Sequence, residues 1–162
     1  MNFSPQSKVW IYQSNRAFTA TEAAAIQKQL DTFTAQWTAH GHQLKAKAEI
    51  RHHFFIVLIV DQDPALATGC SIDASVRVIK GIEQEYGVDL FNRFNMAYKI
   101  DHGVHVVSKE DFETLISIKK IDADTIVYNN LVQNLADYQQ KWEIPLSQSW
   151  HNHIFAEQLN TK

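Results

Sequence analysis

Apolar and polar residues follow strand-like patterns over the first 60 residues of the chain. The segment Val9-Trp10-Ile11-Tyr12 is β-branched and aromatic, which predicts a first strand. Residues 44–50 alternate apolar and polar positions, as expected for a half-buried strand. Residues 54–60 are apolar at every position, so we expect a central strand covered on both faces. The polar residues 51–53 between these two runs predict an antiparallel pair.

Helical spacing of apolar residues predicts two longer helices. Thr19 and Glu22 have the spacing of a capping box, and Gly41 is placed to end the first helix. Asp73 is the predicted N-cap of the second helix, and Gly87 follows its end. The inward-facing positions are Ile26, Leu30, Phe33 and Trp37 in the first helix and Val76, Ile79, Ile82 and Tyr86 in the second.

The C-terminal part predicts a hairpin and further helices. Residues 94–100 and 104–107, separated by a polar turn, have the composition of paired strands. Ser108 and Asp111 are spaced to begin a third helix. Residues 125–128 fit either a short strand or the start of a helix that continues to Tyr138. Three large aromatic residues are expected to pack the tail onto the core: Trp142, Trp150 and Phe155.

The order of the first six elements is strand, helix, strand, strand, helix, strand, which is that of the split βαβ or ferredoxin-like motif. We therefore predict an α+β fold with an antiparallel ferredoxin-like sheet, helices on one face, an appended hairpin and C-terminal helices. The chain has three prolines and no repeat or Gly/Ser-rich linker. This predicts a single domain over residues 1–162.

Composition and charge narrow the class of protein. With 45% apolar and 20% charged residues, the chain has an ordinary globular composition. A formal charge of −3 without a basic field argues against nucleic acid as a partner. The seven-residue apolar run at 54–60 is far shorter than the roughly 20 residues that cross a bilayer, so no membrane span is expected. The start lacks an export signal, and the lone Cys70 allows no internal disulfide, which favours a cytoplasmic location.

The best candidate site is the junction before the second helix. Free amides and the positive dipole end at a helix start favour anions and lower the pKa of a nearby thiol. A small anion there would meet side chains and backbone of Gly69, Ser71, Asp73, Ser75 and Arg77, beside the thiol of Cys70. The structural alternative is that Gly69 turns the chain, Cys70 fills a small pocket and Ser71 or Asp73 only caps the helix.

Two catalytic alternatives remain open from the sequence. Cys70 is a candidate nucleophile or redox thiol if a histidine folds close to it, although no Cys-His family signature surrounds it. Asp61 and Asp63 at the end of the buried strand could serve a metal-dependent hydrolase together with histidines. The histidines form four close pairs: His40 with His42, His52 with His53, His102 with His105, and His151 with His153.

Several segments resemble a family of small uncharacterised bacterial proteins. They are residues 9–16, residues 36–41, Gly69-Cys70-Ser71-Ile72-Asp73, residues 129–132, Trp142-Glu143-Ile144-Pro145, and Ser149-Trp150. Some members of that family carry an ABC-transporter ATPase label. This chain has no Gly-x-x-x-x-Gly-Lys-Ser/Thr phosphate loop, so the resemblance implies no ATP hydrolysis.

The sequence thus favours a ligand-binding or protein-interaction module that acts without a cofactor. Its site is expected at residues 69–73 or on the face of the sheet, and a homodimer is expected by analogy with other open ferredoxin-like sheets.

Overall fold

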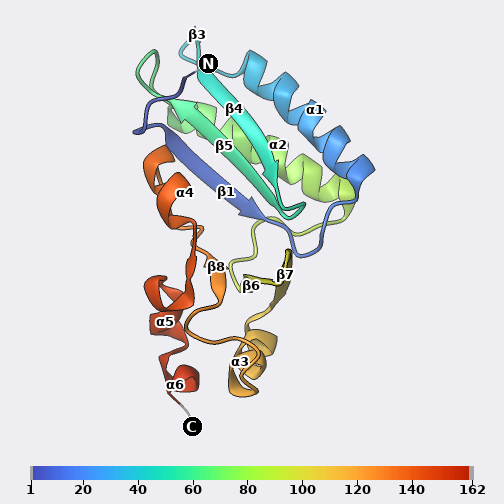
Figure 1. Cartoon of the computed structure of the whole chain (residues 1–162). Helices are drawn as coiled ribbons and strands as arrows, with labels where there is room; N and C mark the ends of the chain where they lie inside the picture. Colours follow the sequence, from blue (N-terminus) through green and yellow to red (C-terminus); the bar gives the residue numbers. More distant parts are fainter. Residues whose placement is uncertain (1, 161–162) are drawn as a thin grey trace.

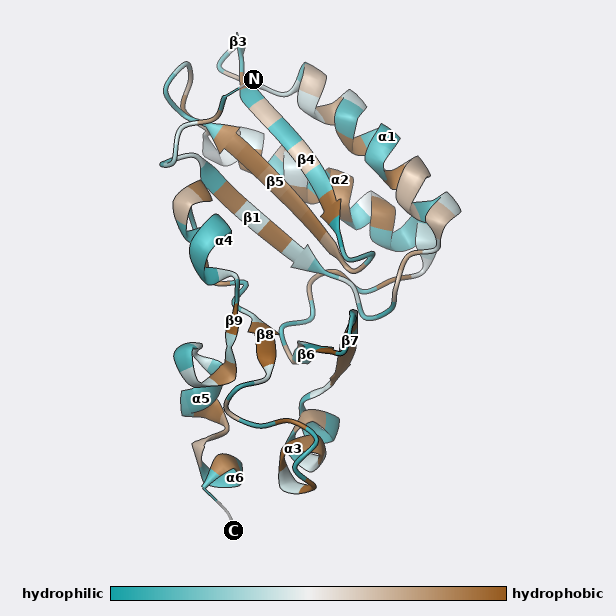
Figure 2. Ribbon diagram, in the orientation of Figure 1, coloured by the Kyte–Doolittle hydropathy of each residue, from teal (hydrophilic) through white to brown (hydrophobic). Residues whose placement is uncertain are grey.

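The fold is built around β5 (Phe55–Asp61), which is buried at every position. The computed structural model describes residues 2–160. Phe55, Val57 and Ile59 face one hydrophobic cluster, whereas Ile56 and Leu58 face another. In Figure 2 β5 is hydrophobic along its length, whereas β4 (Lys45–Arg51) alternates. The prediction of a central strand covered on both faces is confirmed.

The first sheet has the order β1-β5-β4, in which β1 (Lys8–Gln13) and β4 both run antiparallel to β5. α1 (Ala20–Gln36) and α2 (Gly69–Tyr86) lie together on one face of this sheet (Figure 1). Thr19 caps α1 through the predicted box with Glu22, and Gly87 ends α2 in a left-handed conformation. Buried residues of both helices pack on the even-numbered side chains of β5.

This sheet matches part of the ferredoxin-like order predicted above. With β5 between β1 and β4, the elements β1, α1, β4, β5 and α2 follow the split βαβ pattern. In that pattern the strand after α2 would pair with β1. Here β6 (Asn95–Ile100) pairs with β7 (Gly103–Ser108) and β8 (Ile126–Tyr128) instead. The α+β class with antiparallel sheets is shown, whereas the complete ferredoxin-like topology is not.

The C-terminal part forms a second antiparallel sheet of order β7-β6-β8-β9. The predicted hairpin is β6 and β7, and residues 126–128 form a strand that is separate from the next helix. A third cluster joins this sheet to the helices around it, with Phe112 and Phe155 fully buried. The elements that complete this part are α3 (Lys109–Ser117), α4 (Leu135–Lys141), β9 (Glu143–Pro145), η1 (Leu146–Gln148), α5 (His151–Ile154) and α6 (Ala156–Leu159).

The two sheets are joined by one hydrophobic cluster. Odd-numbered side chains of β1 and β5 pack there against Tyr128, Tyr138 and Trp142 of the C-terminal part. Figure 1 shows α4 next to β1 and the second sheet below the first. The expectation that Trp142 and Phe155 pack the tail onto the core is confirmed, because they are 1% and 0% exposed. Trp150 is only partly buried.

Two predicted helix boundaries were wrong. α1 ends before Gly41, which instead shapes the turn between β2 (Thr38–Ala39) and β3 (His42–Gln43). His40 and Gly41 both have positive φ in that turn, 51° and 79°. α2 begins at Gly69 with Thr68 as N-cap, so Asp73 lies inside the helix. Among residues 2–160, no helix combines the length and apolar character needed to cross a bilayer.

Candidate functional site

The predicted junction at the start of α2 is engaged by its own chain. The Ser71 amide donates to Thr68 Oγ1 over 3.4 Å, and the Thr68 amide donates to Ser71 Oγ over 2.7 Å. This is the reciprocal pattern of a capping box. The N-cap is Thr68, five residues before the predicted Asp73. Both residue types can cap a helix, so the sequence pattern did not distinguish them.

The hydroxyl groups expected to contact a ligand point into the protein. Ser71 and Ser75 are buried, and Ser75 Oγ donates to the Ile72 carbonyl over 2.6 Å. The Ser71 carbonyl accepts from Nε1 of buried Trp37 over 2.8 Å. Gly69, Asp73 and Arg77 are exposed, as is Cys70. None of these predicted site residues lines either cavity described below.

Cys70 is an exposed free thiol in the first turn of α2. The alternative that it fills a small buried pocket is therefore wrong. Within residues 2–160, no hydrogen bond or ion pair connects Cys70 to a histidine. The structure thus places the thiol at the surface, where no hydrogen bond to a histidine of residues 2–160 activates it.

Asp61 and Asp63 form a turn rather than an open acidic pair. The Asp61 carboxylate accepts from the Asp63 amide over 3.0 Å and from the Ser4 amide over 3.1 Å, and Lys45 Nζ lies 3.3 Å away. These backbone donors, assisted by Lys45, hold the pKa of Asp61 below its ordinary value. Asp63 is exposed. In the described part of the chain, no three Asp, Glu, His or Cys side chains are grouped to hold a metal ion.

The paired histidines do not form matched ligand sets. His151 and His153 lie on α5 rather than on a strand, so one is buried and the other is exposed. His52 and His53 occupy the β4–β5 turn with positive φ values of 55° and 62°. Histidine adopts this left-handed conformation more readily than most residues with side chains. The pair therefore serves the hairpin turn.

A groove of about 780 Å³ lies along the free edge of β1. Its lining includes Phe91 and Arg93 from the segment before β6, and Leu131 and Val132 from the loop between β8 and α4. Side chains from both faces of β1 contribute to it, as do β6, β8 and Val76 of α2. The groove thus lies between the two sheets, beside the strand edge that β6 leaves uncovered.

Backbone groups of β1 face this groove. The Val9 amide donates to the Gln133 carbonyl over 3.0 Å, away from β5. Because successive residues of an antiparallel strand direct their backbone groups to alternate sides, Ile11 and Gln13 also face the open edge. The next outward residue, Asn15, donates its amide to the Asp89 carbonyl over 3.2 Å. Between these two anchors, no other strand of residues 2–160 pairs with this edge.

A chain of side-chain hydrogen bonds shapes one end of the groove. Trp142 Nε1 donates to Asn130 Oδ1 over 2.9 Å, and Asn130 Nδ2 donates to Gln13 Oε1 over 2.9 Å. Gln13 Nε2 then donates to the Asn95 carbonyl over 3.0 Å. This relay fixes the amide side chains and ties β1 to both β6 and the loop before α4.

The charged groups in the groove lining are both cationic. They are Lys8 and Arg93, and no Asp or Glu of residues 2–160 lines the groove. Neither cation has a hydrogen bond or ion pair with another of residues 2–160. In a chain of net charge −3, this gives the groove a local positive character.

His151 forms a buried part of the groove lining. Its ring stacks on Trp150 with centroids 3.8 Å apart, and its Nδ1 lies 2.7 Å from Ser149 Oγ. Burial lowers the pKa of His151 to about 4, so the imidazole is neutral at pH 7. It therefore adds no charge to the groove at that pH.

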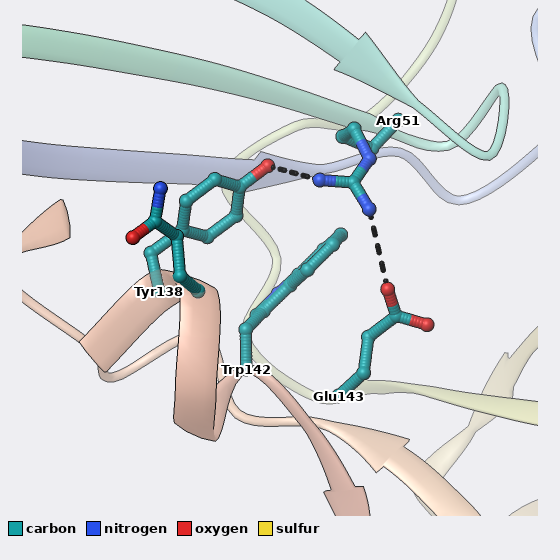
Figure 3. A pocket seen from close by; sticks show the side chains of 5 residues that line it. Arg51, Tyr138, Trp142 and Glu143 are labelled. Carbon is teal, nitrogen blue, oxygen red and sulfur yellow. Dashed lines mark hydrogen bonds and ion pairs between the residues drawn. The ribbon is translucent and has the colours of Figure 1, made fainter. Parts of the chain in front are cut away.

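A second, smaller cavity of about 210 Å³ lies where the β4–β5 hairpin meets α4 (Figure 3). Arg51 donates to Tyr138 Oη over 2.8 Å and to Glu143 Oε1 over 3.3 Å. Its guanidinium also lies 5.0 Å from the Trp142 ring centroid. Burial raises the pKa of Tyr138 to about 12, with a further contribution from Glu49. The phenol is thus protonated at neutral pH.

Glu143 connects this cluster to the hairpin turn. His52 Nε2 lies 3.4 Å from Glu143 Oε1, and Tyr128 Oη donates to Glu143 Oε2 over 3.1 Å. Burial and the neighbouring carboxylate raise the pKa of Tyr128 above its ordinary value. Arg51, Glu143 and the two phenols hydrogen-bond to one another, whereas His52 Nε2 has no hydrogen-bond partner among the described residues. We call this hydrogen-bonded group the clamp, because it connects the two sheets.

The sequence analysis missed both the groove and the clamp. Arg51 was expected in a polar turn and Trp142 in the packing of the tail, and no pattern connected the two residues. One sequence feature could have indicated the groove. The first strand has apolar residues on both faces and only one charged residue, Lys8, at its start. No protein-family model matches the chain, and no curated protein or solved structure is significantly similar to it.

Proposed function

We propose that the protein is a binding module whose ligand occupies the groove along β1. The observation that carries this proposal is that a cavity large enough for a ligand coincides with an unpaired strand edge. Its volume of about 780 Å³ falls within the roughly 300–1,000 Å³ usual for ligand sites. Unpaired backbone donors and acceptors supply directional contacts, and the surrounding apolar side chains supply burial.

The groove has more support than the helix start as the binding site. At the helix start, the Thr68–Ser71 box engages one amide, and the nearby hydroxyls bond to the protein. Phe91 and Leu131 both line the groove and expose 37% and 64% of their surface. Exposed apolar side chains that border a concavity are typical of interaction sites.

A fragment screen by NMR tests this proposal. The ¹⁵N-labelled protein is titrated with a library of neutral, acidic and basic fragments. We expect the fragments that bind to shift the amide signals of Ile11, Phe91 and Leu131. Binding fragments that shift only signals outside the groove, or a library without any binder, would contradict the proposal.

A matched pair of variants makes the test specific. Leu131→Arg places a long charged side chain at the groove, whereas Leu66→Arg changes an equally exposed leucine outside it, the two being 64% and 67% exposed. We expect Leu131→Arg to weaken fragment binding at least tenfold and Leu66→Arg to leave it unchanged. Equal effects of the two substitutions would count against the groove.

A further inference from the structure

We infer that the groove binds an extended peptide with acidic side chains, which pairs with β1 as an added strand. This inference rests on the proposed function, since it names the class of ligand for the same groove. Four features of the described residues support it: the backbone groups, the topology, the side-chain surfaces and the charge.

The backbone groups of the open edge match the needs of a short strand. The carbonyl of Val9 and the amide and carbonyl groups of Ile11 and Gln13 face away from β5, as set by the outward bond of the Val9 amide. The chain itself pairs with the start of this edge, because Leu135 donates its amide to the Ser7 carbonyl over 2.9 Å. Residues 133–135 thus already pair with the start of this edge, and the unpaired part begins at the Val9 carbonyl.

Among residues 2–160, the topology leaves the middle of the β1 edge without a strand partner, whereas residues 133–135 pair with its start. A strand that followed α2 in the split βαβ pattern would pair with this edge. β6 follows α2 in the chain but belongs to the second sheet, and both sheets contribute side chains to the groove. A peptide added at this edge would become the fourth strand of the first sheet, which is the β-augmentation mode of recognition.

The groove offers apolar surface on both faces of such a strand. Successive side chains of a strand point to opposite faces. On the face toward the second sheet the peptide would meet Ile11 and Ala97, and on the helix face it would meet Tyr12 and Phe91. The Tyr12 and Phe91 rings already contact each other edge-on, with centroids 5.3 Å apart. Alternate peptide side chains can therefore both be buried.

Charge selects an acidic peptide over a basic one. Lys8 lies at the start of β1, and Arg93 lies in the segment that leads to Asn95, which Gln13 contacts at the other end of β1. Within the described part of the chain, both are without an ionic partner and no Asp or Glu side chain belongs to the lining. Arginine binds carboxylates through paired, charge-assisted hydrogen bonds. Glutamate side chains near the two ends of a short strand would complement these cations.

Binding of defined peptides tests the inference. The probe is acetyl-Glu-Val-Thr-Val-Glu-amide, and its matched control replaces both glutamates with lysines. We expect the acidic peptide to bind at least tenfold more tightly than the basic one by calorimetry. A third peptide, N-methylated at both valines, keeps the charges but lacks two backbone donors, and we expect it to bind at least tenfold more weakly than the acidic parent.

Hydrogen exchange reports whether the peptide pairs with β1. We expect the Ile11 amide to exchange at least tenfold more slowly in the complex. The Trp10 amide is the internal control, because it already faces β5 and should change little. Arg93→Gln should weaken binding of the acidic peptide about tenfold, whereas Arg77→Gln, an exposed cation on α2 outside the groove, should not.

The alternative results separate this inference from the proposed function. Equal binding of the acidic and basic peptides, or binding without protection of Ile11, would overturn the inference. If fragments nevertheless shift the groove signals, the groove remains a binding site for another ligand class. Sedimentation that shows a concentration-dependent dimer, with Ile11 protected in the peptide-free protein, would identify a second copy of the chain as the occupant and also overturn it.

Discussion

The two edges of the first sheet are built in opposite ways. β4 carries charged residues at alternate positions, Lys45, Lys47, Glu49 and Arg51, and α1 lies beside it. Gln27 of α1 donates its side-chain amide to the Ala48 carbonyl over 3.0 Å. β1 has only Lys8 as a charged residue and presents its backbone to a groove.

This contrast shows which edge is protected against pairing. Charged side chains and a covering helix are common means of preventing edge-to-edge association. β4 has both, whereas the middle of β1 has neither. An unprotected strand edge favours aggregation unless it binds a partner. For this reason we assign the binding role to β1.

Trp142→Ala should have the largest effect, because Trp142 holds the part of the chain that turns the β1 edge into a groove. The ring is 1% exposed and packs edge-on against the Phe55 ring, with centroids 4.9 Å apart. The Arg51 guanidinium lies 5.0 Å from the Trp142 ring centroid. Truncation of a buried tryptophan costs about 3–5 kcal/mol of unfolding free energy. Urea denaturation measures this loss, and Leu66→Ala, at an exposed position, should stay within about 0.5 kcal/mol of the wild type.

A smaller effect is expected from acid, through His151 in the groove lining. Burial lowers the pKa of His151 to about 4, whereas the unfolded chain has the ordinary value of 6.5. As pH falls through 6.5 the unfolded state gains a proton that the native state does not, so stability is lost. The unfolding free energy should fall by about 1.5 kcal/mol from this group between pH 6.5 and 5.

Two histidine variants on the same helix isolate this contribution. His151→Gln should flatten the stability profile between pH 6.5 and 5, because the titrating group is gone. His153→Gln should leave the slope unchanged, because that side chain is exposed. Denaturation at several pH values gives both slopes, and equal slopes in all three proteins would show that His151 is not the source.

Removing the charges of β4 should make it resemble β1. In Lys47→Val with Glu49→Val, the edge loses two of its alternating charges. We expect stability to change by less than about 1 kcal/mol but self-association to increase, because the strand edge is less guarded. Sedimentation velocity at increasing concentration measures the association. A monomer at all concentrations would mean that α1 alone protects this edge.

Cys70→Ser should have the smallest effect. The thiol is exposed and lies outside the groove, so stability should change by less than about 0.5 kcal/mol and peptide affinity should stay the same. A thiol-dependent enzyme would instead lose its activity. Loss of peptide binding in this variant would indicate that the start of α2 contributes to the ligand site.

Local patterns predicted the longer elements and two hairpin pairings, β4 with β5 and β6 with β7, but not the remaining strand partners. The run at 55–60 marked the central strand, and Thr19 with Glu22 marked the start of α1, because both signals lie within a few neighbouring residues. The start of α2 was misplaced because Thr68 and Asp73 offer the same capping chemistry. No sequence pattern indicated that β6 would pair outside the first sheet.

The candidate site shows the same limit. Gly69, Ser71 and Cys70 were singled out because their types and order suit a helix start, but burial and capping depend on contacts such as Trp37 with Ser71. The groove combines residues near positions 10, 92, 131 and 150, and the clamp combines Arg51 with Glu143. Residues so far apart in the chain show no spacing pattern that a single sequence would reveal.

Thus periodicity and capping chemistry in the sequence were enough to determine the α+β class, the buried β5 strand and the approximate positions of α1, α2 and α3, because these depend on neighbours along the chain. Tertiary structure alone decided that β1 has an open edge, that Cys70 is exposed, and that Lys8 and Arg93 share a groove. The reason is that strand pairing and burial are set by which distant segments pack together, and that choice belongs to the whole fold.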